Sequence, residues 1–212
     1  MVAAARNAIH IADGPMTIAA RWRDFPMRVR LAEPFDGDAL FEFCAANREL
    51  RIERTSDGDL IIMPPTGSET GGRNSELHGQ CFAWARQDGT GKTFESSTGF
   101  LLPNGAVRSP DVSWVLKSRW NTLTKEQQGK FAPLCPDFVV ELRSPSDLLH
   151  DVQAKLDEYI ACGARLGWLV DPIGGRVYIY RPGRAVEMLE LPLELRGDPE
   201  LPGLVVDLRP IW

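Results

Sequence analysis

The sequence lacks the residue patterns that mark zinc-binding, disulfide-stabilised and membrane-spanning proteins. The four cysteines and three histidines of the 212 residues are isolated, with no C-x-x-C spacing and no His pair at ligand spacing. Zinc sites and disulfide frameworks need such clusters, so we expect free thiols in a reducing cytoplasm. No apolar run is long enough to cross a bilayer, and Asp13-Gly14-Pro15 interrupts the apolar stretch near the start. We therefore expect neither a membrane span nor a signal peptide.

An excess of positive charge is also missing. The chain has 24 Lys and Arg against 29 Asp and Glu, which gives a formal net charge of -5. Proteins that bind nucleic acid without sequence preference usually carry a basic balance, so this charge weighs against a large nucleic-acid footprint. It does not exclude a local basic strip, for which Arg21, Arg23, Arg28 and Arg30 are candidates. A solvated arm is the alternative interpretation of these four arginines.

The order of apolar and polar segments predicts a single domain of the α/β class. Residues 1–30 are expected to be a loosely ordered arm, and residues 31–212 one domain, because 43% hydrophobic residues suffice for one sizeable core. We expect helices at residues 36–47, 69–87 and 147–161, a hairpin of residues 50–54 and 59–63, and buried strands at residues 112–116, 138–142 and 166–170. Strands that alternate with helices in this order predict a central mixed sheet flanked by helices, preceded by an N-terminal helix and hairpin.

Two acidic residues accompany the first two of these buried strands. Asp111 comes directly before residues 112–116, and Glu141 lies inside residues 138–142. Acids are depleted in strands and are rarely buried without a partner. If the strands are neighbours, the two carboxylates can bind a divalent ion, with Mg²⁺ as the best match and the carbonyl of Leu142 as a third oxygen ligand. The alternative is structural: Asp111 caps a turn, and Glu141 pairs with Arg143.

Lys155 is the basic residue nearest to this pattern. It lies on the flank of the apolar stripe of the helix at residues 147–161. Its ammonium either extends into solvent, which is the usual arrangement, or points back to Glu141. In the second case burial would lower its pKa, and the amine could orient or deprotonate an attacking water. Ser144 and Ser146 have no nearby His and are expected to cap the helix.

The tripeptide Gly91-Lys92-Thr93 matches the last residues of a phosphate-binding loop motif. The motif requires a glycine where Arg86 stands. The segment also follows a helix and precedes a strand, which is the reverse of the required order. We therefore exclude a nucleotide-binding loop here.

Several stretches occur in the order typical of one protein family. They are residues 108–113, residues 137–146, residues 155–159, Gly163 and residues 168–172. Over these stretches the sequence resembles the Uma-two family, which is grouped with restriction endonucleases in the wider P-D-(D/E)-x-K nuclease superfamily. The resemblance implies a restriction-endonuclease-like core with a metal site on two adjacent strands. It also implies that Asp111 and Glu141 are the two motif acids.

The sequence departs from the superfamily pattern at the motif lysine. Arg143 stands two residues after the second acid, and arginine stays protonated, so it cannot act as a base. The resemblance points instead to Lys155 as the motif lysine on the following helix. Superfamily members often add an acid from an early helix, for which Glu69 and Glu76 are the candidates. The implied activity is Mg²⁺-dependent hydrolysis of DNA phosphodiesters, with Mn²⁺ as a substitute ion.

Two other classes of function are also compatible with the sequence. A non-catalytic module that binds DNA or protein on a nuclease scaffold would fit the acidic net charge. An assembly protein that dimerises through its hairpin edges would fit the strand-rich pattern, although a homodimer is equally compatible with a nuclease. Magnesium binding would separate the nuclease from the non-catalytic module.

Overall fold

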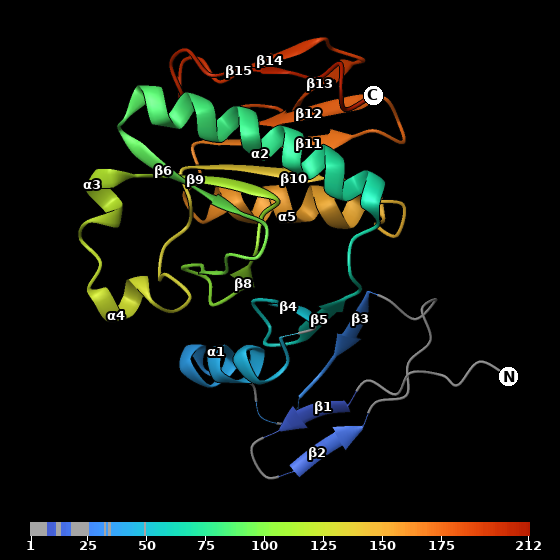
Figure 1. Cartoon of the computed structure of the whole chain (residues 1–212), viewed down its shortest axis with the longest axis vertical. Helices are drawn as coiled ribbons and strands as arrows, with labels where there is room; N and C mark the ends of the chain where they lie inside the picture. Colours follow the sequence, from blue (N-terminus) through green and yellow to red (C-terminus); the bar gives the residue numbers. More distant parts are fainter. Residues whose placement is uncertain (1–7, 12–13, 18–25, 32, 34, 49) are drawn as a thin grey trace, which may run out of the picture.

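The computed structural model describes residues 8–11, 14–17, 26–31, 33, 35–48 and 50–212 (Figure 1). Its helices are α1 (Gly37–Ala46), α2 (Ser68–Asp88), α3 (Lys117–Trp120), α4 (Lys125–Gln128) and α5 (Leu149–Ala161). The strands of the first half are β1 (Ala8–Ile11), β2 (Gly14–Thr17), β3 (Met27–Val29), β4 (Arg51–Arg54), β5 (Leu60–Met63), β6 (Gly91–Glu95), β7 (Phe100–Leu101) and β8 (Val107–Arg108). The remaining strands are β9 (Val112–Leu116), β10 (Phe138–Leu142), β11 (Leu166–Asp171), β12 (Arg176–Tyr180), β13 (Glu187–Glu190), β14 (Glu194–Arg196) and β15 (Val205–Asp207).

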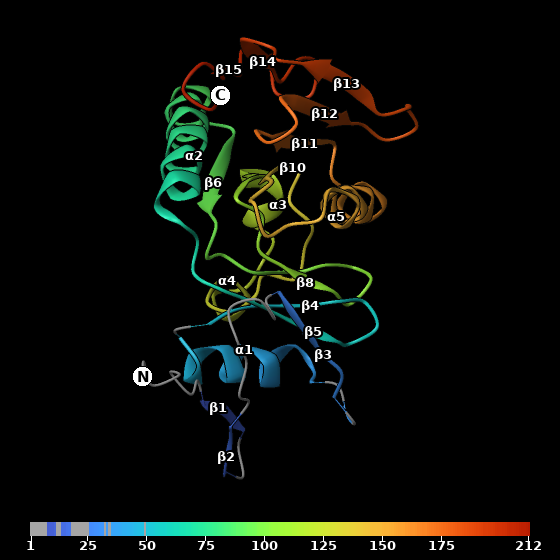
Figure 2. The same ribbon diagram turned by 90° about the vertical axis from the view of Figure 1, so that its right-hand side faces the viewer.

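A six-stranded mixed sheet forms the centre of the molecule. Its strand order is β13-β12-β11-β10-β9-β6, and β10 and β11 are parallel whereas the other pairs are antiparallel. α2 and α5 lie on opposite sides of this sheet (Figures 1 and 2). The predicted α/β fold, with a central mixed sheet flanked by helices, is therefore confirmed.

The alternation of side chains along β10 assigns each residue to one of two cores. Phe138, Val140 and Leu142 belong to the core beneath α2, whereas Val139 belongs to the core beneath α5. Because side chains alternate with period two along a strand, Glu141 faces the α5 side. The fold therefore turns an acid toward the helix that carries Lys155.

A second, five-stranded sheet lies beside the first. Its order is β3-β5-β4-β8-β7, and α1 covers the face that points away from the six-stranded sheet (Figure 2). Asp36 begins α1, because its carboxylate accepts a hydrogen bond from the amide of Ala39 at 2.8 Å. Leu40 and Phe43 of α1 are buried in one core with residues of β4 and β5. This arrangement confirms the predicted N-terminal helix and hairpin.

The C-terminal segment that contains the hairpin of β14 and β15 is bonded to α2. The side-chain amide of Gln80 forms two hydrogen bonds with the backbone of Asp207, at 3.0 and 2.7 Å. Arg73 donates to the carbonyl of Ile211 at 2.8 Å. α2 ends at Gly89, whose φ of 71° is a left-handed conformation that glycine adopts without strain.

Some expectations from the sequence were wrong in detail. β3 lies inside the predicted arm of residues 1–30 yet pairs with β5, and β1 pairs with β2. Other parts of that arm (residues 1–7, 12–13 and 18–25) lie outside the described residues, and the division into domains stays a prediction. α5 begins at Leu149 with Leu148 as its N-cap. Ser144 and Ser146 therefore do not cap it: their hydroxyls hydrogen-bond each other, and that of Ser144 also bonds Asp147.

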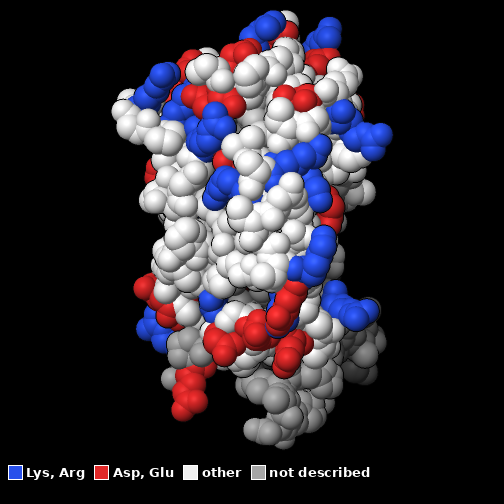
Figure 3. Space-filling model, turned by 90° about the vertical axis from the view of Figure 1, so that its left-hand side faces the viewer, with Lys and Arg blue, Asp and Glu red and all other residues white. Residues whose placement is uncertain are grey.

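Charge on the described surface is mixed. Arg28 and Arg30 both bind the carboxylate of Asp59, at 2.7 and 3.0 Å, so this half of the predicted basic strip is paired with an acid. Arg21 and Arg23 lie outside the described residues. Figure 3 shows one face, on which Lys and Arg lie in separate groups among uncharged and acidic side chains. Among the helices that the structure describes, none has the length and apolar character of a membrane span.

Candidate active site

Asp111 and Glu141 come together where β9 and β10 pair. The antiparallel ladder of these strands ends at the pair Val112–Val140, and the two acids lie next to that pair. Both residues are buried, with 6% and 5% of their surface exposed. The amide of Leu142 donates to Asp111 Oδ2 at 2.8 Å. The predicted neighbourhood of the two acids is therefore present, at one end of the paired strands.

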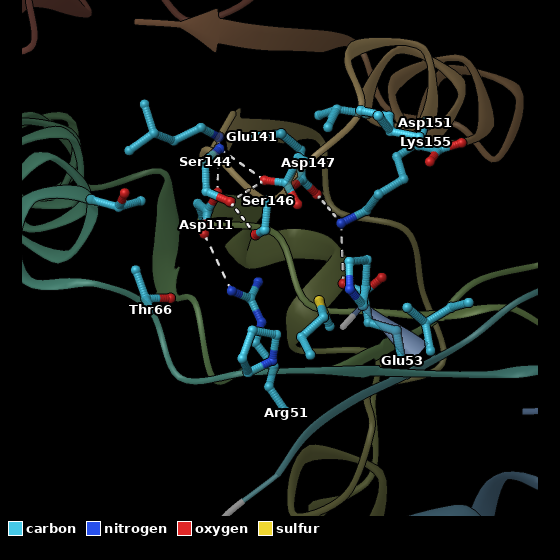
Figure 4. Close-up of a pocket in the computed structure, with 18 of the residues that line it drawn as sticks. Arg51, Glu53, Thr66, Asp111, Glu141, Ser144, Ser146, Asp147, Asp151 and Lys155 are labelled. Carbon is cyan, nitrogen blue, oxygen red and sulfur yellow. Dashed lines mark hydrogen bonds and ion pairs between the residues drawn. The ribbon is translucent and has the colours of Figure 1, made fainter. Parts of the chain in front are cut away.

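Lys155 extends from α5 into the same region (Figure 4). Its Nζ lies 2.9 Å from Glu141 Oε1 and 3.1 Å from Glu53 Oε1. Val152, Leu156 and Tyr159 pack α5 against the sheet, which lays the stem of Lys155 along the core. Lys155 therefore points inward and forms ion pairs with Glu141 and Glu53, instead of extending into solvent.

Glu53 belongs to the site but is absent from the sequence-based expectations. It comes from β4 of the five-stranded sheet, and its side chain is 2% exposed. Besides Lys155, it binds Arg108 Nη1 at 3.2 Å and the amide of Ser109 at 3.1 Å. β4 reads Arg-Ile-Glu-Arg, so Glu53 lacks the apolar surroundings that marked Glu141 in the sequence. Sequence pattern alone does not tell which strands of two different sheets face each other.

Burial and neighbouring charges shift the pKa values of the site in opposite directions. Burial raises the pKa of Glu141 to about 7; Lys155 opposes this shift, while Asp111 and Glu53 add to it. Burial would also raise the pKa of Glu53, but Lys155, Arg108 and Arg51 outweigh burial and lower it to about 2. The two carboxylates thus differ because Glu53 has more cations around it.

The expectation that burial lowers the pKa of Lys155 was wrong. Burial does favour the neutral amine, but Glu141 and Glu53 outweigh it and raise the pKa above the ordinary value. Lys155 is therefore an ammonium ion at neutral pH. It can donate hydrogen bonds and supply positive charge, and it is not a general base in this arrangement.

These side chains line a cleft of about 870 Å³. One wall comes from β4 and β5, and the other from the end of β10 and the start of α5. The segment that leads into α2 closes one side, with Thr66 among its residues (Figure 4). Arg51 also lines the cleft, and its Nη1 is 3.6 Å from Asp111 Oδ1. The cleft can therefore admit a ligand directly to Asp111, Glu141 and Lys155.

The other predicted site residues pair with side chains outside the site or do not line the cleft. Arg143 pairs with Asp171 at 3.1 Å, so the alternative in which it neutralises Glu141 was wrong. Glu69 lies at the edge of the cleft, largely exposed, and pairs with Arg73 at 2.9 Å. Glu76 is exposed and is not among the residues that line the cleft.

From α2, the side-chain amide of Asn74 contacts Asp111. Asn74 donates from Nδ2 to Asp111 Oδ1 at 3.1 Å. Its Oδ1 is buried and has no hydrogen-bond partner among the described residues. A buried acceptor without a donor is costly, so this oxygen favours a donor or a cation beside Asp111.

The donor set fits a magnesium ion. Asp111 and Glu141 supply carboxylate oxygens, and the carbonyl of Leu142 points to the same side of β10 as its amide, which is the side of Asp111. Mg²⁺ prefers such oxygen ligands and keeps several waters, so few protein ligands suffice. Within the described ranges, no three His, Cys, Asp or Glu side chains form a ready metal cluster. Glu53 is turned instead to Lys155 and Arg108.

Comparison with known proteins agrees with this geometry. Residues 38–209 match the sequence model of the Uma2 family, which is described as "Putative restriction endonuclease". A crystal structure of a "putative nuclease belonging to DUF820" from Anabaena variabilis ATCC 29413 superposes with a TM-score of 0.64 and 20% sequence identity. The match covers 76% of this chain and 88% of that one, and at this identity it establishes the fold alone. No curated protein matches the chain.

The family match spans most of the chain, including both acid-bearing strands and α5. It agrees with the resemblance seen in the sequence motifs around Asp111, Glu141 and Lys155. The chain belongs to the Uma2 family of restriction-endonuclease-like proteins.

Proposed function

We propose that this protein is a Mg²⁺-dependent DNA endonuclease that hydrolyses phosphodiester bonds. The observation that carries the proposal is the group of Asp111, Glu141 and Lys155 at the wall of one large cleft. The nuclease-like family supports a phosphodiester as the bond that is cut. Mn²⁺ is the expected substitute ion.

Asp111, Glu141 and the carbonyl of Leu142 would hold the ion. When bound, a magnesium ion makes its water more acidic and neutralises charge that builds on the phosphate. Lys155 contributes differently, because its ammonium stays protonated between Glu141 and Glu53. It donates a hydrogen bond that orients the attacking water or a phosphate oxygen. Arg51 lines the same cleft, where it contacts Asp111 and donates to the carbonyl of Ser109, and it would add positive charge near a bound phosphate.

A non-catalytic module that binds DNA or protein is the second candidate. The contact between Arg51 and Asp111, at 3.6 Å, favours it, because this guanidinium already supplies positive charge beside Asp111. The net charge of -5 also favours a small nucleic-acid footprint. Loss of the magnesium affinity would be expected of such a module. A homodimer and a cytoplasmic location, both expected from the sequence, stay predictions.

Titration calorimetry and single-turnover cleavage of plasmid DNA test the proposal. Asp111→Asn and Glu141→Gln should each abolish magnesium binding and cleavage while the protein stays folded. Lys155→Ala should bind magnesium but cut about 10²-fold more slowly, which is the usual effect of removing one donor that stabilises transition-state charge. Glu76→Gln is the matched control, since it neutralises an acid that does not line the cleft. Undiminished magnesium affinity in both acid variants would contradict the proposed site.

A further inference from the structure

We propose that Glu53 is the positioning residue for Lys155, so that the site is built from both sheets. This inference rests on the proposed function, because it assigns a task to the lysine of that site. Glu53 lies on β4 of the five-stranded sheet, whereas Asp111, Glu141 and Lys155 belong to the six-stranded sheet and α5. Figure 4 shows Lys155 reaching across the cleft between these two parts.

The carboxylate of Glu53 is held rigidly. Its Oε1 accepts from Lys155 Nζ and from the amide of Ser109, both at 3.1 Å, and its Oε2 accepts from Arg108 at 3.2 Å. Arg108 is itself fixed by Glu158, at 2.6 Å. Since the side chain of Glu53 is 2% exposed and bonded on three sides, it offers Lys155 one fixed acceptor.

A fixed acceptor matters because a lysine side chain is long and flexible. Ordering such a chain costs rotamer entropy, so a single ion pair leaves the ammonium free to move. Glu53 and Glu141 bind the same ammonium from two different strands, at 3.1 and 2.9 Å. An ammonium has three donors, and these two bonds leave one for a ligand in the cleft. Glu53 therefore determines where that third donor points.

The competing explanation is that Glu53 only fixes Arg108, which lies in the same five-stranded sheet and contacts α5 through Glu158. The two roles are separable, because Glu158 also binds Arg108. The described ion pairs of Lys155 are with Glu53 and Glu141. Glu158→Gln thus disturbs the contact between α5 and the five-stranded sheet and keeps both carboxylates that bind the lysine. Glu53→Gln removes the negative charge at Lys155, and Glu53→Asp keeps the charge but withdraws it by one methylene.

The first measurement is NMR of the Lys155 ammonium in metal-free protein. A hydrogen-bonded, buried ammonium exchanges its protons slowly and gives a resolved ¹H–¹⁵N signal, which Lys155→Met identifies by its loss. We expect this signal to broaden or vanish in Glu53→Gln and Glu53→Asp and to persist in Glu158→Gln. An unchanged signal in both Glu53 variants would overturn the inference, whether or not the protein cuts DNA.

The second measurement is a double-mutant comparison of cleavage. Glu53→Gln and Glu53→Asp should each lower kcat by about 10- to 100-fold with little change in KM, as expected when the partner of a functional group is lost. In a Lys155→Met background, Glu53→Gln should have no further effect, because nothing remains to be positioned. Equal factors in both backgrounds would overturn the inference. Absence of cleavage by the wild type would instead refute the proposed nuclease function, and the NMR result would still decide the role of Glu53.

Discussion

Lys155→Met removes an ammonium that lies between two buried carboxylates. The side chains of Glu53 and Glu141 are 2% and 6% exposed, and that of Lys155 is 19% exposed. Methionine has a similar length and an apolar stem, so the packing of α5 on the sheet should change little. The loss of stability should therefore come from the two carboxylates that remain without their shared partner.

The size of this loss follows from what each carboxylate keeps. Removing one member of a buried ion pair costs about 3–5 kcal/mol. Glu53 keeps Arg108 and the amide of Ser109, and Glu141 keeps the hydroxyl of Tyr159 at 2.9 Å. We therefore expect the lower end of that range, a loss of about 3 kcal/mol in the free energy of unfolding.

Lys130→Met is the matched control. Lys130 also bridges two acids, Asp38 and Glu126, both at 3.1 Å, but these side chains are 70% and 78% exposed. Exposed ion pairs contribute little to stability, because water and salt screen them. Urea denaturation followed by tryptophan fluorescence compares the two variants. If both variants lost the same stability, burial would not be what makes the Lys155 contacts strong, and our account of the site would be refuted.

Three further outcomes are expected. Asp171→Ala should lower the free energy of unfolding by about 3 kcal/mol or more, measured by urea denaturation, because it leaves Arg143 without its buried partner; equal stability would mean that this pair contributes nothing. The pKa of Asp59 is lowered to about 2 by its two arginine partners. Its contribution to stability is thus present above about pH 4 and is lost as the pH falls through 2, so the stability gap between wild type and Asp59→Asn should close over that range; a constant gap would contradict it. Gly91→Ala should destabilise by about 1–3 kcal/mol, since the added Cβ would lie 2.1 Å from the ring of Trp114; a thermal melt identical to wild type would contradict this.

Local pattern predicted the elements near the site well. The apolar, β-branched segments became β9 and β10, with Asp111 directly before β9 and Glu141 inside β10, as predicted. The predictions failed where other hydrogen bonds competed with the contact that the local pattern suggested. The hydroxyls of Ser144 and Ser146 suggested a helix cap, but they bond within the loop, and α5 begins at Leu149, two residues later than expected.

The protonation of Lys155 shows what a local argument cannot reach. Burial alone predicts a lowered pKa, and the sequence contains nothing that says otherwise. The direction of the shift reverses because Glu141 and Glu53 both lie beside the ammonium, and Glu53 is about a hundred positions away in the chain. The additional acid expected from an early helix is a similar case. Glu69 and Glu76 are of the expected type, but α2 places Asn74 beside Asp111.

The sequence by itself determined the α/β class, the two acid-bearing strands and the family, because these depend on periodicity and on motifs whose members are close in the chain. It did not determine which residues of β4 and α2 meet those strands. That was decided by tertiary packing, which brings β4 to α5 and α2 to the start of β9. The contacts are hydrogen bonds and ion pairs between residues far apart in the chain. Such long-range contacts leave no periodic pattern. The burial of the ion pairs and the protonation of Lys155 therefore became apparent only from the tertiary structure.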